Sequence, residues 1–272
     1  MLLAATALLL LSRGAAAVKC TPSSTDLPPG RFDLVVSFSK ACDAPENAAC
    51  DSCKLWQMAS QAKSPALGYI YSGSKSGVHR AKIIPTRALP GLESAARDGH
   101  DTSLYWVQAL ADAAKGGGTL PTGLPHKARS PLAFANSLAY RDQHQLHIHV
   151  GDAANANFST CAAKIVAKPP AAGVWTGPSA YDPKSSACRA LGVGGRDVAI
   201  YATSSAGDKI SSTIRSGFRS GKVVSEAKSN DIVADPALAR TAVLVLRPNP
   251  TGNYVVFLIS NTNDEKVFGN KT

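Results

Sequence analysis

Aromatic side chains and long apolar runs are both scarce in this sequence. Aromatic residues make up only 6% of the 272 residues. Beyond the N-terminal segment, no stretch reaches the roughly 18 consecutive apolar residues that suggest a transmembrane helix. The basic residues are scattered, and the sequence contains neither a zinc-finger pattern nor an aromatic RNA-binding motif. With 44% apolar residues, the chain is expected to be globular and to have no nucleic-acid partner.

The N-terminal segment is the exception to this scarcity. Residues 2–11, LLAATALLLL, form an apolar run too short for a comfortable transmembrane span, and Arg13 and Ala15-Ala16-Ala17 follow it. This pattern predicts a signal peptide over residues 1–17, and hence a secreted or periplasmic-like protein. Left uncleaved, the run could anchor the protein to a membrane. A linker is predicted over residues 18–31, and a single domain over residues 32–272.

Cysteines are few but even in number, which in a secreted chain predicts disulfides. The chain has six: Cys20, Cys42, Cys50, Cys53, Cys161 and Cys188. Cys42 could pair with Cys50 or Cys53 and close a small loop, and Cys161 could pair with Cys188. The sequence alone does not determine the connectivity.

Positive charge is plentiful. The full chain has a formal net charge of +10. Removal of residues 1–17, which contain one Arg and no acidic residue, leaves 28 − 19 = +9. A basic surface attracts anionic partners. We therefore expect a phosphorylated substrate and contact with phospholipid surfaces.

The apolar pattern predicts an antiparallel sheet with helices. Strands are expected over residues 68–72, 78–86, 132–139, 145–150, 198–203, 242–247 and 254–260. The clearest helix is expected over residues 101–115, capped by Asp101 or Thr102, with Leu104, Val107 and Leu110 on its buried face. A helical turn over residues 55–62 and a helix over residues 157–168 are also expected. The fold class is therefore α+β, with a long helix packed on one face of the sheet.

One predicted strand carries the residues with the most distinctive chemistry. From Gln145 to Val150 the sequence Q-L-H-I-H-V alternates strictly, so Leu146, Ile148 and Val150 would face a core. Gln145, His147 and His149 would share the opposite face, where the two imidazoles could project into a phosphate-sized hollow.

Paired imidazoles suit phosphate chemistry. Because histidine has an ordinary pKa of about 6.5, one ring can be neutral and attack phosphorus while a protonated neighbour stabilises charge. Two other interpretations remain open: the rings are simply solvated, or they are two ligands of a metal. No Glu within ten residues and no other nearby side chain supplies an evident third ligand, so no metal is expected.

The residues before this strand suggest a family. Asn136 precedes Gln143 by seven residues, and Gln143 precedes His147 by four. This order resembles the histidine-triad (HIT) superfamily and, more closely, the CDP-diacylglycerol pyrophosphatase family within it. The residues that carry the resemblance are Asn136-Ser137, Arg141-Asp142-Gln143 and His147-Ile148-His149. The resemblance extends over roughly residues 33 to 268.

The resemblance implies a HIT-like antiparallel sheet, extended by the C-terminal strands, and hydrolysis of CDP-diacylglycerol to CMP and phosphatidate without a cofactor. One of His147 and His149 would be the nucleophile and the other would assist. A full triad has three histidines and this strand has two, so the attacking ring stays open. Residues expected to bind substrate are Asn136, Gln143 and Gln145, together with Lys82 and Arg87, two cations placed in or just after the second strand.

Two alternatives belong beside this hypothesis. The same kind of pocket could act on other nucleoside diphosphate derivatives. The loss of one histidine also fits a secreted protein that binds a nucleotide or an anionic lipid without turning it over.

Overall fold

The computed structural model describes the parts of the chain that form the sheet and its covering helices. These are residues 42–43, 45, 50, 53–62, 68–73, 80–89, 91–92, 100–115, 131–137, 145–152, 156–169, 171, 174–176, 199–204, 206–219, 240–249, 252–260 and 267–268. The predicted signal peptide, the predicted linker and the cysteines Cys20 and Cys188 lie outside the described residues. So does Gln143.

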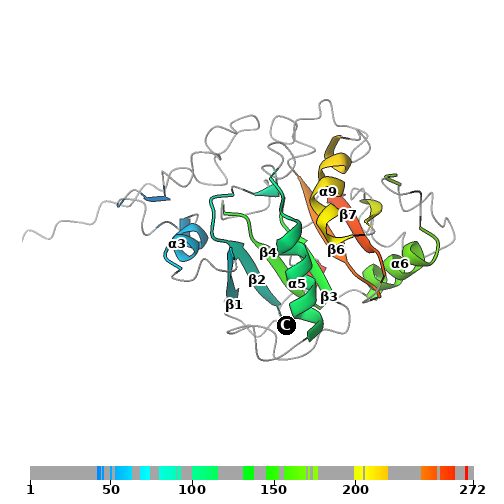
Figure 1. Ribbon diagram of the computed structural model, residues 1–272, viewed down its shortest axis with the longest axis horizontal. Helices are drawn as coiled ribbons and strands as arrows, with labels where there is room; N and C mark the ends of the chain where they lie inside the picture. The colour runs from blue at the N-terminus through cyan, green and yellow to red at the C-terminus, as the bar shows by residue number, and fades with distance from the viewer. Residues whose placement is uncertain are drawn as a thin grey trace, which may run out of the picture.

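Seven strands form one antiparallel sheet in the order β1-β2-β4-β3-β6-β7-β5 (Figure 1). Their bounds are β1 (Tyr69–Gly73), β2 (Arg80–Pro85), β3 (Pro131–Ala135), β4 (Ile148–Asp152), β5 (Ala199–Ser204), β6 (Thr241–Leu246) and β7 (Tyr254–Ser260). The four α-helices among the described residues are α3 (Lys54–Ser60), α5 (Ser103–Lys115), α6 (Ala156–Ala167) and α9 (Ile210–Arg219). The α+β prediction is confirmed, and the C-terminal strands do extend the sheet.

One face of the sheet packs against α5 and α9, which lie side by side in front of it in Figure 1. The core between them contains Trp106 and Leu110 from α5 and Ile214 and Phe218 from α9. The strands contribute small and β-branched side chains to this face, such as Ile148. Burial of these apolar groups is the main stabilising term for the sheet.

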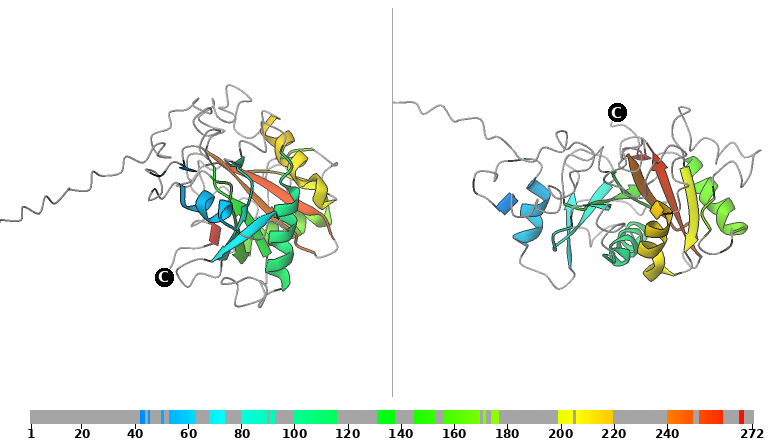
Figure 2. Two further views of the ribbon diagram at one scale, coloured as in Figure 1. Left: turned by 60° about the vertical axis from the view of Figure 1, so that its left-hand side comes forward. Right: turned by 90° about the horizontal axis from the view of Figure 1, so that it is seen from above.

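The opposite face is covered at its two ends. At one end α3 packs Leu55 and Ala59 against Ile84 of β2. At the other end α6 packs Phe158 and Ile165 on the face formed by β3, β6, β7 and β5. Figure 2 shows α3 and α6 far apart along the sheet. None of the described helices is long and apolar enough to cross a membrane.

Most predicted elements occur close to their expected positions, but the two strands around the histidines are shorter. Strand β3 ends at Ala135, where the sequence predicted a strand to residue 139, and β4 begins at Ile148. Their register pairs Phe134 with His149, and the described residues 136–137 and 145–147 lie outside both strands. The tight turn expected at residues 141–142 lies outside the described residues.

Helix α9 was not predicted from the sequence. Its sequence, ISSTIRSGFR, contains Ser, Thr and Gly, residues that form helices poorly by themselves. Its apolar residues Ile210, Ile214 and Phe218 recur every four positions and are all buried. Tertiary packing of this narrow stripe therefore outweighs weak local propensity.

The buried face of α5 was predicted only in part, since Leu110 is buried as expected. Leu104 is 58% exposed and Val107 only partly buried, whereas Trp106 is fully buried with Ala109 and Leu110. The stripe is centred on the large indole, which removes more apolar surface from water than Leu104 would. The predicted cap is correct, because the Ser103 backbone N–H donates to Asp101 Oδ1 at 2.9 Å.

A disulfide joins Cys42 to Cys53, which selects one of the two expected pairings for Cys42. Cys50 and Cys161 are also disulfide-bonded. The Cys42–Cys53 bridge is buried next to the start of α3, so it fixes the segment that leads into this helix.

A buried carboxyl lies on α5. Asp112 is only 7% exposed and accepts a hydrogen bond from Gln108 Nε2 at 2.7 Å. Burial raises the pKa of Asp112 above its ordinary value of 3.8, and the nearby Lys115 charge opposes this rise. Because the folded state prefers the neutral acid, ionisation of Asp112 lowers stability as the pH rises above that ordinary value.

We expect Asp112→Asn to increase the free energy of unfolding at pH 7 but not at pH 3, because Asn keeps the acceptor for Gln108 and removes the buried charge. Urea unfolding of both proteins at the two pH values measures this. An equal difference at pH 3 and pH 7 would show that ionisation of Asp112 does not affect folding.

Candidate active site

The side chains of β4 and of the two residues before it lie alternately on the two faces of the sheet. Leu146, Ile148 and Val150 all belong to the core under α5 and α9, as the alternation predicted. His147 lies one residue before β4 and His149 within it, and their ring centroids are 5.0 Å apart with an angle of 65° between the rings. The structure therefore brings the two imidazoles into direct contact.

The rings are more enclosed than the sequence predicted. His147 is 6% exposed and His149 is 3% exposed. The phosphate-sized hollow expected beside the two rings stays a prediction.

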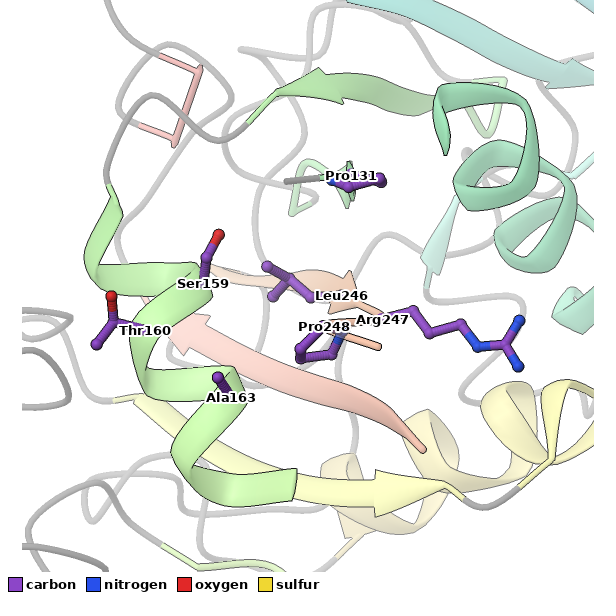
Figure 3. Close-up of a pocket in the computed structure, with 7 residues that line it drawn as sticks. All are labelled: Pro131, Ser159, Thr160, Ala163, Leu246, Arg247 and Pro248. Atoms are coloured by element: carbon purple, nitrogen blue, oxygen red, sulfur yellow. The ribbon is translucent and has the colours of Figure 1, made fainter. Parts of the chain in front are cut away.

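A cavity of about 310 Å³ does lie elsewhere on the same side of the sheet (Figure 3). It lies between α6 and the ends of β3 and β6, and its lining residues are Pro131, Ser159, Thr160, Ala163, Leu246, Arg247 and Pro248. The side chain of Arg247 points away from the other labelled residues in Figure 3. Its Nε donates to the Gly252 carbonyl oxygen at 3.3 Å, and its guanidinium lies over the Tyr254 ring.

One hydrogen bond sets the tautomer of His147. Its Nδ1 lies 2.9 Å from the backbone carbonyl oxygen of Gln145. A carbonyl oxygen can only accept, so Nδ1 carries the hydrogen. In the neutral ring, Nε2 then holds the lone pair. A nitrogen with a lone pair is required for attack on phosphorus.

His149 lies between a cation and aromatic rings. Lys82 of β2 and Phe134 of β3 are its direct partners on the two neighbouring strands, so their side chains share its face. Phe268, near the C-terminus, lies with its ring centroid 6.4 Å from that of His149. The structure therefore places Lys82, a predicted substrate-binding residue, on the histidine face, whereas Phe268 was not identified from the sequence.

Gln145 is fully buried and hydrogen-bonded to the backbone at the end of β2 and just after it. Its Nε2 donates to the carbonyl oxygens of Pro85 and Arg87, and its Oε1 accepts from the Leu89 N–H, at 2.7, 2.8 and 3.2 Å. These contacts fix the backbone carbonyl of Gln145, which in turn binds His147. Substrate binding by Gln145 stays a prediction, but positioning of the histidine segment is evident.

Asn136 lies at the end of β3 and is 8% exposed. Continuing the β3–β4 register by two residues from the Phe134–His149 pair places Asn136 opposite His147. The next residue, Ser137, is 1% exposed, and its Oγ makes no hydrogen bond. The sequence indicated the Asn136-Ser137 pair but gave no separate role to this hydroxyl.

Arg87 does not join this cluster. Its side chain is exposed, and its charge acts on Tyr105 of α5, on the opposite side of the sheet. Burial raises the pKa of the Tyr105 phenol, the positive charge of Arg87 opposes that rise, and Asp101 adds to it. Binding of substrate by Arg87 stays a prediction. Among the described residues, no group of three His, Cys, Asp or Glu side chains could hold a metal ion.

We expect Gln145→Ala to lower the free energy of unfolding by about 2–4 kcal/mol, because it leaves a buried N–H and buried carbonyl groups without partners. Urea unfolding measures this loss, and Gln57→Ala, in a partly exposed glutamine of α3, is the control. A loss of activity at unchanged stability would instead assign Gln145 to substrate binding alone.

A comparison with protein families finds a match for this chain. The family model described as CDP-diacylglycerol pyrophosphatase matches residues 38–164. The matched stretch contains β1 to β4, Asn136 and both histidines, whereas β5 to β7 follow it. A comparison with curated proteins gives no match. Over residues 38–164, the chain is therefore similar to the CDP-diacylglycerol pyrophosphatase family, whose members are CDP-diacylglycerol diphosphatases.

Proposed function

We propose that this enzyme hydrolyses CDP-diacylglycerol to CMP and phosphatidate with His147 as its nucleophile. The family match implies the pyrophosphatase activity and the substrate. The hydrogen bond between His147 Nδ1 and the Gln145 carbonyl carries the choice of nucleophile, because it leaves Nε2 to attack.

The reaction has two steps. In the first, His147 Nε2 attacks one phosphorus of the pyrophosphate, a P–N bond forms, and the bond from that phosphorus to the bridging oxygen breaks. The electron pair leaves with the departing phosphate. In the second, water attacks the same phosphorus, the P–N bond breaks, and one proton of the water is released. His147 is thereby restored.

His149 and Lys82 supply positive charge near the reacting phosphate. In its protonated form the His149 ring, 5.0 Å from that of His147, stabilises charge on the leaving oxygen. Lys82 lies directly across from His149 on β2 and offers a second cation on the same face. Asn136 is proposed to donate its amide N–H to a phosphate oxygen, because the strand register places it opposite His147.

Both rings are nearly covered, which fits a reaction that excludes bulk water. Fixed dipoles and charges stabilise a transition state more strongly in such surroundings than in water. Entry of the pyrophosphate between the two histidines then requires displacement of the groups around them.

Release of CMP from CDP-diacylglycerol by the purified protein tests this proposal. We expect His147→Ala to lower kcat by about 1,000-fold or more, since no nucleophile remains. His149→Ala should lower kcat by roughly 100-fold, the contribution of a general acid or charge stabiliser. The control is His100→Ala, at an exposed position just before α5.

Trapping the covalent intermediate identifies the attacking ring. Rapid acid-free quenching followed by mass spectrometry is expected to place the phosphorus adduct on His147 in the wild type, and in His149→Ala at a lower rate. An adduct on His149, or full activity of His147→Ala, would reject His147 as the nucleophile.

The lipid specificity has a separate test. We propose that the diacylglycerol moiety is recognised along with the cytidine diphosphate. Competition of CDP-glycerol against CDP-diacylglycerol measures the contribution of the acyl chains. Equal kcat/KM values for the two would favour an enzyme for soluble nucleoside diphosphate derivatives.

We further propose that the protein acts outside the cytoplasm at an anionic lipid surface. Residues 1–17 resemble a signal peptide, and the net charge of 28 − 19 = +9 that remains after their removal favours such surfaces. Mass spectrometry of the N-terminus of the cell-derived protein tests the first part. Sedimentation with anionic and with neutral vesicles tests the second, and equal binding to both would reject it.

A further inference from the structure

The sheet and the helices on one of its faces repeat one arrangement twice. The first unit runs β2-α5-β3-β4 along the chain, and the second runs β5-α9-β6-β7. In the sheet the strands of the first unit stand in the order β2-β4-β3, and those of the second stand in the mirrored order β6-β7-β5. Such an order results when two similar units meet across a two-fold axis between the antiparallel strands β3 and β6.

The hydrogen-bond register supports this correspondence. In the first unit Gly151 pairs with Arg80, the first residue of β2, and with Leu132, the second residue of β3. In the second unit Ile259 pairs with Ala199, the first residue of β5, and with Ala242, the second residue of β6. Gly151 and Ile259 therefore occupy equivalent positions.

The helices α5 and α9 also contact each other through equivalent residues at their starts. The Ser211 N–H at the start of α9 donates to Ser103 Oγ at the start of α5, at 2.9 Å, and the Thr102 N–H donates to Ser211 Oγ at 3.1 Å. Trp106 of α5 and Ile214 of α9 both enter the one core under these helices.

Only the first unit carries the histidines. Counting back from Gly151 and Ile259, His147 corresponds to Val255 and His149 to Phe257. Both counterparts are fully buried apolar side chains. The second unit therefore keeps the architecture and lacks the chemistry.

Each unit is followed by a helical segment that lies on the other unit. After β4, α6 packs on a surface that includes Tyr201 and Phe257 of the second unit. After β7, Val267 and Phe268 return to the first unit, where Phe268 contacts Phe134 and His149 with ring centroids 6.4 Å apart in both cases.

The counterpart of Phe268 shows what this ring does. By the same counting, Phe268 corresponds to Thr160 and Val267 to Ser159, two residues that line the cavity in Figure 3. Counting forward from the equivalent residues Leu132 and Ala242, Asn136 beside the histidines corresponds to Leu246 on the wall of that cavity. On the second unit, Thr160 borders an open cavity. At the equivalent place on the first unit, the ring of Phe268 fills the space next to His149.

We propose that Phe268, contributed by the second unit, is a positioning residue for His149. Its ring holds the imidazole in place through ring contact and shields it from water, so the site in the first unit is complete only with the second. This inference rests on the proposed function of the two histidines. The histidine-free unit thus has a task in the reaction although it does not touch the substrate.

Removal of the ring tests the proposal through both activity and accessibility. We expect Phe268→Ala to lower kcat by up to about 100-fold with KM nearly unchanged, because a misplaced assisting group affects the transition state more than substrate binding. Phe268→Leu, which keeps most of the volume and is expected to fold, should lose kcat to a smaller extent, and Phe268→Tyr should retain most of it.

The accessibility of His149 is measured by its rate of modification with diethyl pyrocarbonate, followed by peptide mass spectrometry. Modification should be several-fold faster in Phe268→Ala and in Phe268→Leu than in the wild type. The matched control is Phe158→Ala, which removes a phenyl ring of similar burial from the same core, 8% exposed against 7% for Phe268. It should lose comparable stability and leave the modification rate unchanged.

Wild-type kcat in Phe268→Leu and Phe268→Ala would overturn the proposal, as would a modification rate of His149 no faster than in Phe158→Ala. These outcomes are distinct from failure of the proposed function, which appears as CMP release by His147→Ala. The modification rate reports the shielding of His149 whichever ring attacks.

Discussion

The site depends on the hydrogen bonds between the segment that leads into β4 and the end of β2. The buried side-chain amide of Gln145 bonds three backbone groups at the end of β2 and just after it, and the backbone carbonyl of Gln145 accepts a hydrogen bond from His147 Nδ1. A slip of one residue in β4 would turn His149 into the core and Ile148 out of it, so the apolar alternation and this amide clamp specify the same register. The position of His147 and the folding stability therefore depend on the same few hydrogen bonds.

Much of the fold and part of the site could be predicted from local pattern. Alternation in Q-L-H-I-H-V correctly separated Ile148 from the histidines, because a strand with one core face has no other stable register. Lys82 was predicted as a candidate cation of the second strand, but only the strand register places it directly across from His149. The helix α9 could not be found this way, since its stability comes from Ile214 and Phe218 packing into a core formed by residues distant in sequence.

The contacts around the histidines were less predictable for the same reason. Phe268 follows His149 by more than a hundred residues, and nothing in its local sequence indicates a partner. The enclosure of the rings also depends on long-range packing, so an open hollow was expected where the structure shows nearly covered side chains. The exposure of Leu104 has a similar origin, because the position of one large indole in the core decides which face of α5 turns inward.

The serine network at the helix starts has a kinetic consequence. The bonds between Thr102 or Ser103 and Ser211 join residues 109 and 108 positions apart along the chain. Because loop closure over such lengths precedes any gain from the contact, pairings of this kind form late and slow the folding of the whole sheet. During synthesis, the half that carries the histidines emerges from the ribosome first and must wait with its β3 edge unpaired until β6 has been made.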